Sequence, residues 1–140
     1  MDIYYTDGSA SPNPGPGGFA VIKNMKPHIL GSEDGNTTNI RMEGLALLAA
    51  IKDAKDQPAT IYTDSQFWIN VVTQWAPNWK AKGWVKKGGE IKNIDIVKEL
   101  FEAYESSSVQ LAWVRGHVGT EGNEMAYEWA NKARGGVRIN

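Results

Sequence analysis

The sequence predicts an α/β fold in which a mixed sheet is packed against helices. Two observations support this fold class: short apolar runs typical of strands, and longer runs with helical spacing that alternate with them. The composition is 41% hydrophobic and 22% charged, which is ordinary for a globular protein. A chain of 140 residues is long enough for one domain with a buried core, so residues 1–140 are predicted to form a single domain.

Five runs rich in β-branched, aromatic or other apolar residues are predicted to be strands. They cover residues 2–6, 19–23, 28–34, 59–63 and 109–115. The glycine- and proline-rich run 8–18 is predicted to be a loop that belongs to no helix or inner strand. A turn at 24–27 and a polar connector at 35–39 complete the predicted N-terminal half.

Helices are predicted where apolar residues recur every three or four positions. They cover 40 to about 55, 66–76 and 94–105, with a last helix over 123–134. Asn39 is the predicted N-cap of the first helix. Pro77 is predicted to end or restart the second helix, and a short helix after it would stop at Gly83.

Composition excludes several kinds of site. The chain has no cysteine, which excludes disulfides, zinc–thiolate centres and thiol nucleophiles. No apolar run approaches the ~20 residues of a membrane span, and the first residues do not resemble a signal peptide, so we expect a cytoplasmic protein without membrane contact.

The net charge of −1 does not indicate a polyanionic partner, yet the segment 80–98 is locally basic. Its lysines are Lys80, Lys82, Lys86, Lys87, Lys92 and Lys98.

Two predicted strands lead into nearly identical sequence segments, "IYYTD" and "IYTD", whose last residues are Asp7 and Asp64. The hairpin and helix between them allow a crossover that makes the two strands parallel, and parallel neighbours end at the same edge of a sheet. Glu43 lies in the first turn of the predicted first helix. Taken one at a time, each acid has a structural explanation: Asp7 as a turn residue, Asp64 as the cap of the following helix, and Glu43 as an acid stabilised by the helix dipole. Together they suit Mg²⁺ or Mn²⁺, so the residues alone leave structural roles and a metal centre open.

Several ordered motifs resemble ribonuclease H type 1, of the cellular, bacterial kind with a basic protrusion. They are "TDGSASPNPGPGG", "TTNIRMEG", "YTDSQ", "TQWAPNWKAKGW" and "WVRGHVGTEGNE", and the resemblance runs from Asp2 to Ala133. It implies a ribonuclease H-like, five-stranded mixed sheet flanked by helices on both faces. It also implies a monomeric endonuclease that hydrolyses the RNA strand of RNA–DNA hybrids and leaves 5′-phosphate and 3′-hydroxyl ends.

The resemblance also implies roles for individual residues. Asp7, Glu43 and Asp64 match the catalytic carboxylates that bind two Mg²⁺ or Mn²⁺ ions, and His117 matches a histidine that assists proton transfer or product release. The matched substrate contacts are Asn13, Asn39 and Gln66 for the RNA strand, and Thr38, Trp75 and Asn78 for the DNA strand. Ile40 stands where the family often has a second asparagine, and the lysine-rich segment matches the protrusion that binds phosphates.

One position departs from the family pattern. "GNEMAYEWA" has Tyr127 where a fourth carboxylate is expected, four residues after Asn123. A phenol is a poor Mg²⁺ ligand, so one ion of the pair should bind weakly and cleavage should be impaired. We hypothesise that Glu124, three residues earlier on nearly the same side of the helix, or a water, partly substitutes. The alternatives are a hybrid-binding module that has lost catalysis and, less favoured, a DNA strand-transfer enzyme on the same fold.

Overall fold

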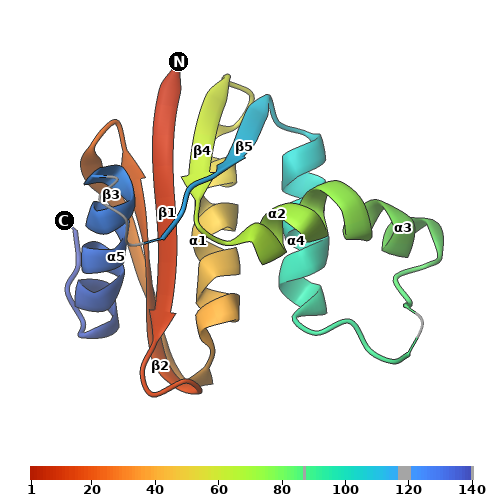
Figure 1. The fold of residues 1–140 in the computed structure, drawn as a ribbon, viewed down its shortest axis with the longest axis horizontal. Coiled ribbons are helices and arrows are strands. Elements are labelled where there is room, and N and C mark those ends of the chain that lie inside the picture. Colours follow the sequence, from red (N-terminus) through yellow and green to blue (C-terminus); the bar gives the residue numbers. More distant parts are fainter. Residues whose placement is uncertain (87, 117–120, 140) are drawn as a thin grey trace.

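The computed structural model describes residues 1–86, 88–116 and 121–139, and within them it contains one five-stranded sheet (Figure 1). The strand order is β3-β2-β1-β4-β5. The strands are β1 (Asp2–Ala10), β2 (Gly15–Lys23), β3 (Lys26–Thr37), β4 (Ala59–Thr63) and β5 (Val109–Trp113). β1 runs antiparallel to β2 and parallel to β4, and β4 runs parallel to β5. The predicted mixed sheet is therefore confirmed.

Helices cover both faces of the sheet, as predicted. They are α1 (Asn39–Ala54), α2 (Gln66–Asn70), a π-helical turn η1 (Val71–Trp75), α3 (Ala76–Ala81), α4 (Ile94–Glu105) and α5 (Glu121–Arg134). α1 packs on one face against β1 and β2, with α4 beyond it. α5 packs on β1, β2 and β3 from the opposite face (Figure 1).

The main core lies between the sheet and the layer that α1 and α4 form. Its largest fully buried side chains include Tyr4, Leu47, Ile61, Trp68 and Leu100. They come from two central strands and three different helices, so this core fixes α1 relative to β1 and β4. In the described ranges, no helix combines the length and apolar character needed to cross a membrane.

The predicted loop over 8–18 is wrong for most of its length. β1 continues to Ala10 and β2 begins at Gly15, so only 11–14 forms the turn, and β2 is an inner strand. The prolines do not prevent this, because Pro12 and Pro14 lie in the turn and Pro16 lies at a break in the β2–β3 register. The glycines allow neighbouring elements to approach closely. The predicted connector 35–39 is also largely strand, since β3 extends to Thr37.

The start of α1 also differs from the prediction. Thr38, rather than Asn39, is the N-cap, and its hydroxyl accepts a hydrogen bond of 3.1 Å from the Arg41 N–H. Asn39 is the first helical residue, and its side chain instead accepts a hydrogen bond of 2.6 Å from the Ala10 N–H. Glu43 therefore lies beyond the first turn, so the helix dipole does not explain its position.

The predicted helix over 66–76 is divided in the structure. α2 passes into the π-helical turn η1 and then into α3, so helical structure continues through Pro77 to Ala81. Pro77 is the second residue of α3, directly after the point where the helix changes from π to α geometry. The proline thus restarts the helix, which was one of the two predicted outcomes.

Candidate metal centre

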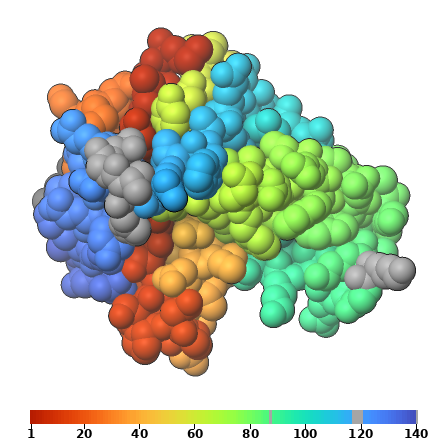
Figure 2. All heavy atoms as spheres, viewed as in Figure 1, coloured from red at the N-terminus to blue at the C-terminus, as the bar shows by residue number. Residues whose placement is uncertain are grey.

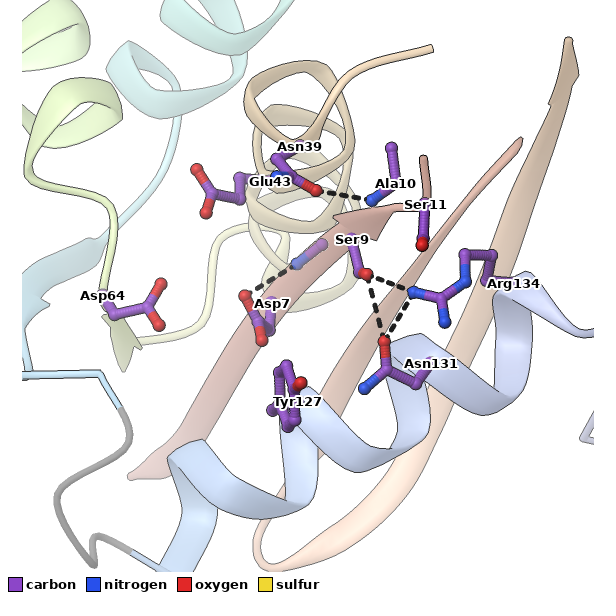
Figure 3. Close-up of a pocket in the computed structure, with 11 residues that line it drawn as sticks. Asp7, Ser9, Ala10, Ser11, Asn39, Glu43, Asp64, Tyr127, Asn131 and Arg134 are labelled. Atoms are coloured by element: carbon purple, nitrogen blue, oxygen red, sulfur yellow. Dashed lines mark hydrogen bonds between the residues drawn. The ribbon is translucent and has the colours of Figure 1, made fainter. Parts of the chain in front are cut away.

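Three carboxylates meet above the centre of the sheet (Figure 3). One oxygen from each of Asp7, Glu43 and Asp64 lies within 4.8 Å of the other two. Asp64 directly follows β4, as predicted. Asp7, which was predicted to follow the end of its strand, lies inside β1. The parallel register still brings them together, because Thr6 pairs with Thr63 and the next residue on each strand is an aspartate.

Glu43 reaches the two aspartates because α1 lies directly on β1. A Cβ placed on Gly8 would collide with the backbone of Met42 and Glu43, so only glycine permits this approach. Gly8 also donates its N–H to Asp7 Oδ1 at 2.9 Å. The indole Nε1 of Trp113 donates to the Asp64 carbonyl oxygen at 3.2 Å, which holds the chain after β4 in place.

Burial and mutual repulsion make this cluster unfavourable when all three groups are charged. Burial, and after it the charges of Asp64 and Glu43, raise the pKa of Asp7 to about 8, against the opposing hydrogen bond from the Gly8 N–H. Burial, followed by the charge of Asp64, raises the pKa of Glu43 to about 7, against a hydrogen bond from Ser65. Within the described part of the chain, no lysine or arginine forms an ion pair with the three carboxylates.

The donor set fits a hard divalent cation. Carboxylate oxygens are the ligands that Mg²⁺ and Mn²⁺ prefer, and a bound cation would offset the repulsion that raises these pKa values. The cluster opens into a cavity of about 410 Å³, which leaves room for water and phosphate oxygens. Asp7, Glu43 and Asp64 are therefore the residues that would hold the metal.

The position of the expected fourth carboxylate lies on the same cavity. Tyr127, on α5, lines the cavity with Asp7 and is 43% exposed (Figure 3). Glu124 is exposed and lies outside both the cavity lining and the carboxylate cluster, so the structure does not bring it to the site. The buried Asn123 is closer, since its amide donates to Asp64 Oδ2 at a long distance of 3.5 Å.

The residues expected to contact the RNA strand lie around the carboxylates. Asn39 lines the cavity, and its N–H donates to Asn13 Oδ1 at 3.2 Å, which ties the turn after β1 to the start of α1. Gln66 begins α2, two residues after Asp64, and donates to Asn70 Oδ1 at 3.1 Å. His117 lies outside the described residues.

The residues expected to contact the DNA strand lie farther out. Trp75 and Asn78 line a second hollow of about 490 Å³, together with Lys82 and Lys86. This hollow belongs to the part of the chain formed by 66–86 and 88–93, which Figure 2 shows in green at one side of the molecule. Thr38 lies apart from this hollow, at the cap of α1.

Comparison with known proteins decides the family. The family model described as RNase H matches residues 2–134. The chain belongs to the ribonuclease H family. It is 44% identical over 138 residues to Ribonuclease H of Francisella philomiragia subsp. philomiragia, an alignment that spans 94% of this chain and 89% of the relative.

Two solved structures are also similar to this chain. LC9-RNase H1, described as a type 1 RNase H with the type 2 active-site motif, matches with a TM-score of 0.82 and 28% identity, over 96% of this chain and 72% of that one. A foamy viral protease-reverse transcriptase in complex with RNA/DNA hybrid matches with a TM-score of 0.80 and 22% identity, over 97% of this chain and 20% of that one. The second similarity concerns the fold alone.

Three of the remaining cavity-lining side chains form hydrogen bonds with one another and were given no role in the sequence analysis. Ser9 comes from β1, and Asn131 and Arg134 come from α5. Their spacing is compatible with positions on the cavity but does not single them out from other polar residues. Ser9 lies two residues after Asp7, on the same face of the strand, and positions 127, 131 and 134 follow one face of a helix.

Proposed function

We propose that this chain is an endonuclease that hydrolyses the RNA strand of RNA–DNA hybrids with the help of divalent metal ions. The observation that carries the proposal is the convergence of Asp7, Glu43 and Asp64 in a member of the ribonuclease H family. The 44% identity to a relative named Ribonuclease H supports the same activity.

In this proposal, the chain's carboxylates act as metal ligands. Mg²⁺ or Mn²⁺, when bound, would supply Lewis-acid activation of water and stabilisation of the leaving oxygen. Asp7, the most buried of the three acids, would face both ion positions, and Glu43 and Asp64 would complete one of them. The raised pKa values of Asp7 and Glu43 mean that these groups must lose protons when the metal binds. His117 is proposed to assist proton transfer or product release.

Tyr127 is proposed to impair the second ion position. A phenol is uncharged at neutral pH and does not replace a carboxylate as an Mg²⁺ ligand. With Glu124 outside the cavity, the described residues offer no substitute acid there. We therefore propose one strong and one weak metal position, and cleavage slower than a fourth carboxylate would allow.

The substrate is proposed to lie across the cavity and the second hollow. Asn13, Asn39 and Gln66, near the carboxylates, would contact the RNA strand, where a 2′-hydroxyl distinguishes RNA from DNA. Trp75 and Asn78, with the lysines of that hollow, would hold the DNA strand, and Thr38 a DNA phosphate. Since these groups all come from one chain, we propose a monomer that acts as a single domain, in the cytoplasm where bacterial RNA–DNA hybrids form.

One observation favours a second candidate function, a hybrid-binding module with little or no catalysis. That observation is Tyr127 at the position where a carboxylate is expected. Incubation with labelled RNA–DNA hybrid, duplex DNA and duplex RNA, each with Mg²⁺, Mn²⁺ or chelator, separates the two candidates. Cleavage of the hybrid alone, lost with chelator, is the expected result. Tight hybrid binding without cleavage under any metal would replace the nuclease with the binding module.

A further inference from the structure

The cavity has a cationic end that the metal site does not use. It is formed by Ser9 on β1 and by Asn131 and Arg134 on α5 (Figure 3). We infer that this trio, the phosphate fork, binds the phosphate next to the scissile one on the RNA strand. The inference rests on the proposed function and adds a positioning site for the strand to be cut.

Close packing of α5 on β2 brings the phosphate fork together. Gly18 lies opposite Ser9 in the β1–β2 ladder. A Cβ on Gly18 would collide with the backbone nitrogen of Arg134 and the backbone carbonyl oxygen of Ala130, so the last turns of α5 lie directly on the strand. The side chains of Asn131 and Arg134 therefore reach across to Ser9.

The hydrogen bonds of the phosphate fork leave its outer donors available. Arg134 Nη1 donates to Ser9 Oγ at 2.5 Å and to Asn131 Oδ1 at 2.7 Å, and Ser9 Oγ donates to Asn131 Oδ1 at 3.0 Å. Among the described residues, no acceptor is bonded to Arg134 Nε or Nη2. These two nitrogens form the planar pair that binds two phosphate oxygens at once.

The same bonds fix the orientation of the Asn131 amide. A guanidinium only donates, so Asn131 must present its oxygen to Arg134. Its Nδ2 is consequently turned away from Arg134, as Figure 3 shows. Asn131 Nδ2 thus offers further donors to an oxyanion in the cavity.

The charge of Arg134 is available to a ligand. In the part of the chain that the structure describes, no carboxylate lies within 4.0 Å of its guanidinium. It is also the one cation among the described residues that line this cavity. Lys132, on the same helix, differs because it is exposed and pairs with Glu128 at 2.9 Å.

The spacing along β1 matches a strand of nucleic acid. Asp7 and Ser9 face the same side of the strand, roughly 6 to 7 Å apart. That distance is comparable to the separation of neighbouring phosphates along one strand. A scissile phosphate at the carboxylates would therefore place its neighbour at Arg134.

The first test compares Arg134→Gln with Lys132→Gln, which removes the same charge from the same helix outside the cavity. Single-turnover cleavage of a labelled hybrid is followed against enzyme concentration at several salt concentrations. Losing a charge-assisted bidentate contact should raise the half-saturating concentration by about tenfold or more. It should also lower the slope of log affinity against log salt by about one, while Lys132→Gln changes neither. Equal behaviour of the two variants would overturn the inference.

The second test locates the phosphate. RNA strands that carry one neutral methylphosphonate at successive positions are annealed to DNA and cut by wild type and Arg134→Gln. Wild type should lose cleavage about tenfold at the bond next to the neutral position, and Arg134→Gln should lose nothing further there. Equal additional losses in both proteins would contradict the inference.

Two controls separate the possible failures. Thermal unfolding of Arg134→Gln and Arg134→Lys checks the fold, and Arg134→Lys should recover the salt slope without full affinity. If wild type does not cleave, the salt slope of hybrid binding still tests Arg134, and an unchanged slope in Arg134→Gln rejects the phosphate fork. If wild type cleaves and Arg134→Gln behaves like it, the phosphate fork is rejected and the proposed function stands. If wild type neither binds nor cleaves the hybrid, the proposed function is rejected as well.

Discussion

The two walls of the cavity differ in burial, charge and the way they are built. The acidic wall carries Asp7, Glu43 and Asp64, and the α5 wall carries Tyr127 and Arg134. Asp7 is 5% exposed and Tyr127 is 43% exposed. The acidic wall depends on strand register and on the contact of Gly8 with α1, so its residues are fixed by the core. The α5 wall presents an exposed helix face, where a carboxylate can be replaced without disturbing the fold.

The largest expected effect comes from breaking the acidic wall. Asp7→Asn should lower hybrid cleavage by about a thousandfold or more, since it removes the ligand proposed to face both ion positions. The measurement is initial cleavage of a labelled hybrid with saturating Mg²⁺. Asp56→Asn, at an exposed aspartate outside the cavity lining, is the matched control and should cleave normally. Comparable rates for both variants would remove Asp7 from the mechanism.

The next effect comes from making the two walls alike. Tyr127→Asp should raise cleavage by about tenfold or more, because it adds a carboxylate beside Asp7. Tyr127→Asn has nearly the same size as Tyr127→Asp and no charge, so it should gain less. Equal rates for the two variants in Mg²⁺ would show that the missing carboxylate does not limit the enzyme.

In the absence of metal, the buried acids of the acidic wall should make the free energy of unfolding depend on pH. The folded-state pKa of Asp7 is about 8 and that of Glu43 about 7, both above the ordinary values of 3.8 and 4.5 for these side chains. Between about pH 4 and 8 the folded chain therefore holds protons that the unfolded chain has lost, so stability falls as pH rises through this window.

This fall should be visible in urea unfolding with chelator present. Asp7→Asn should flatten the slope of the unfolding free energy against pH, and Mn²⁺ should raise stability most at the alkaline end. A wild-type stability that rises between pH 5 and 8 in chelator would contradict the assigned burial of these acids.

The smallest effect concerns the support of the acidic wall. Thr38→Ala should lower the free energy of unfolding by about 1 kcal/mol, because the Thr38 hydroxyl caps α1. Thr38→Ser keeps the capping oxygen and serves as the control in the same urea titration. Equal stability of Thr38→Ala and wild type would leave substrate binding as the only role for this side chain.

The sequence predicted the fold class because strand and helix periodicity are local properties. It failed at 8–18, where glycine and proline were taken to exclude an inner strand. Gly8 and Gly18 lie in inner strands because helices on opposite faces press against them, and this need is visible only in three dimensions. The N-cap of α1 was predicted one residue too late, because threonine at 38 and asparagine at 39 are both favoured at an N-cap.

The residues of the acidic wall could be named from ordered motifs, because Asp7, Glu43 and Asp64 each end or follow a recognisable run. The phosphate fork could not. Polar residues near the end of a helix that packs on a sheet are usual in any protein, and only the contact of α5 with Gly18 brings Asn131 and Arg134 to Ser9. The site therefore depends on local sequence for its acids and on tertiary packing for its cation.

A calorimetric titration with Mn²⁺ tests the metal centre most directly. Wild type should bind one Mn²⁺ per chain strongly, with a second only weakly, and proton release should accompany binding. Asp7→Asn should lose the strong site, and Tyr127→Asp should strengthen the weak one. Unchanged Mn²⁺ affinity in Asp7→Asn would contradict the claim that these three carboxylates form the metal centre.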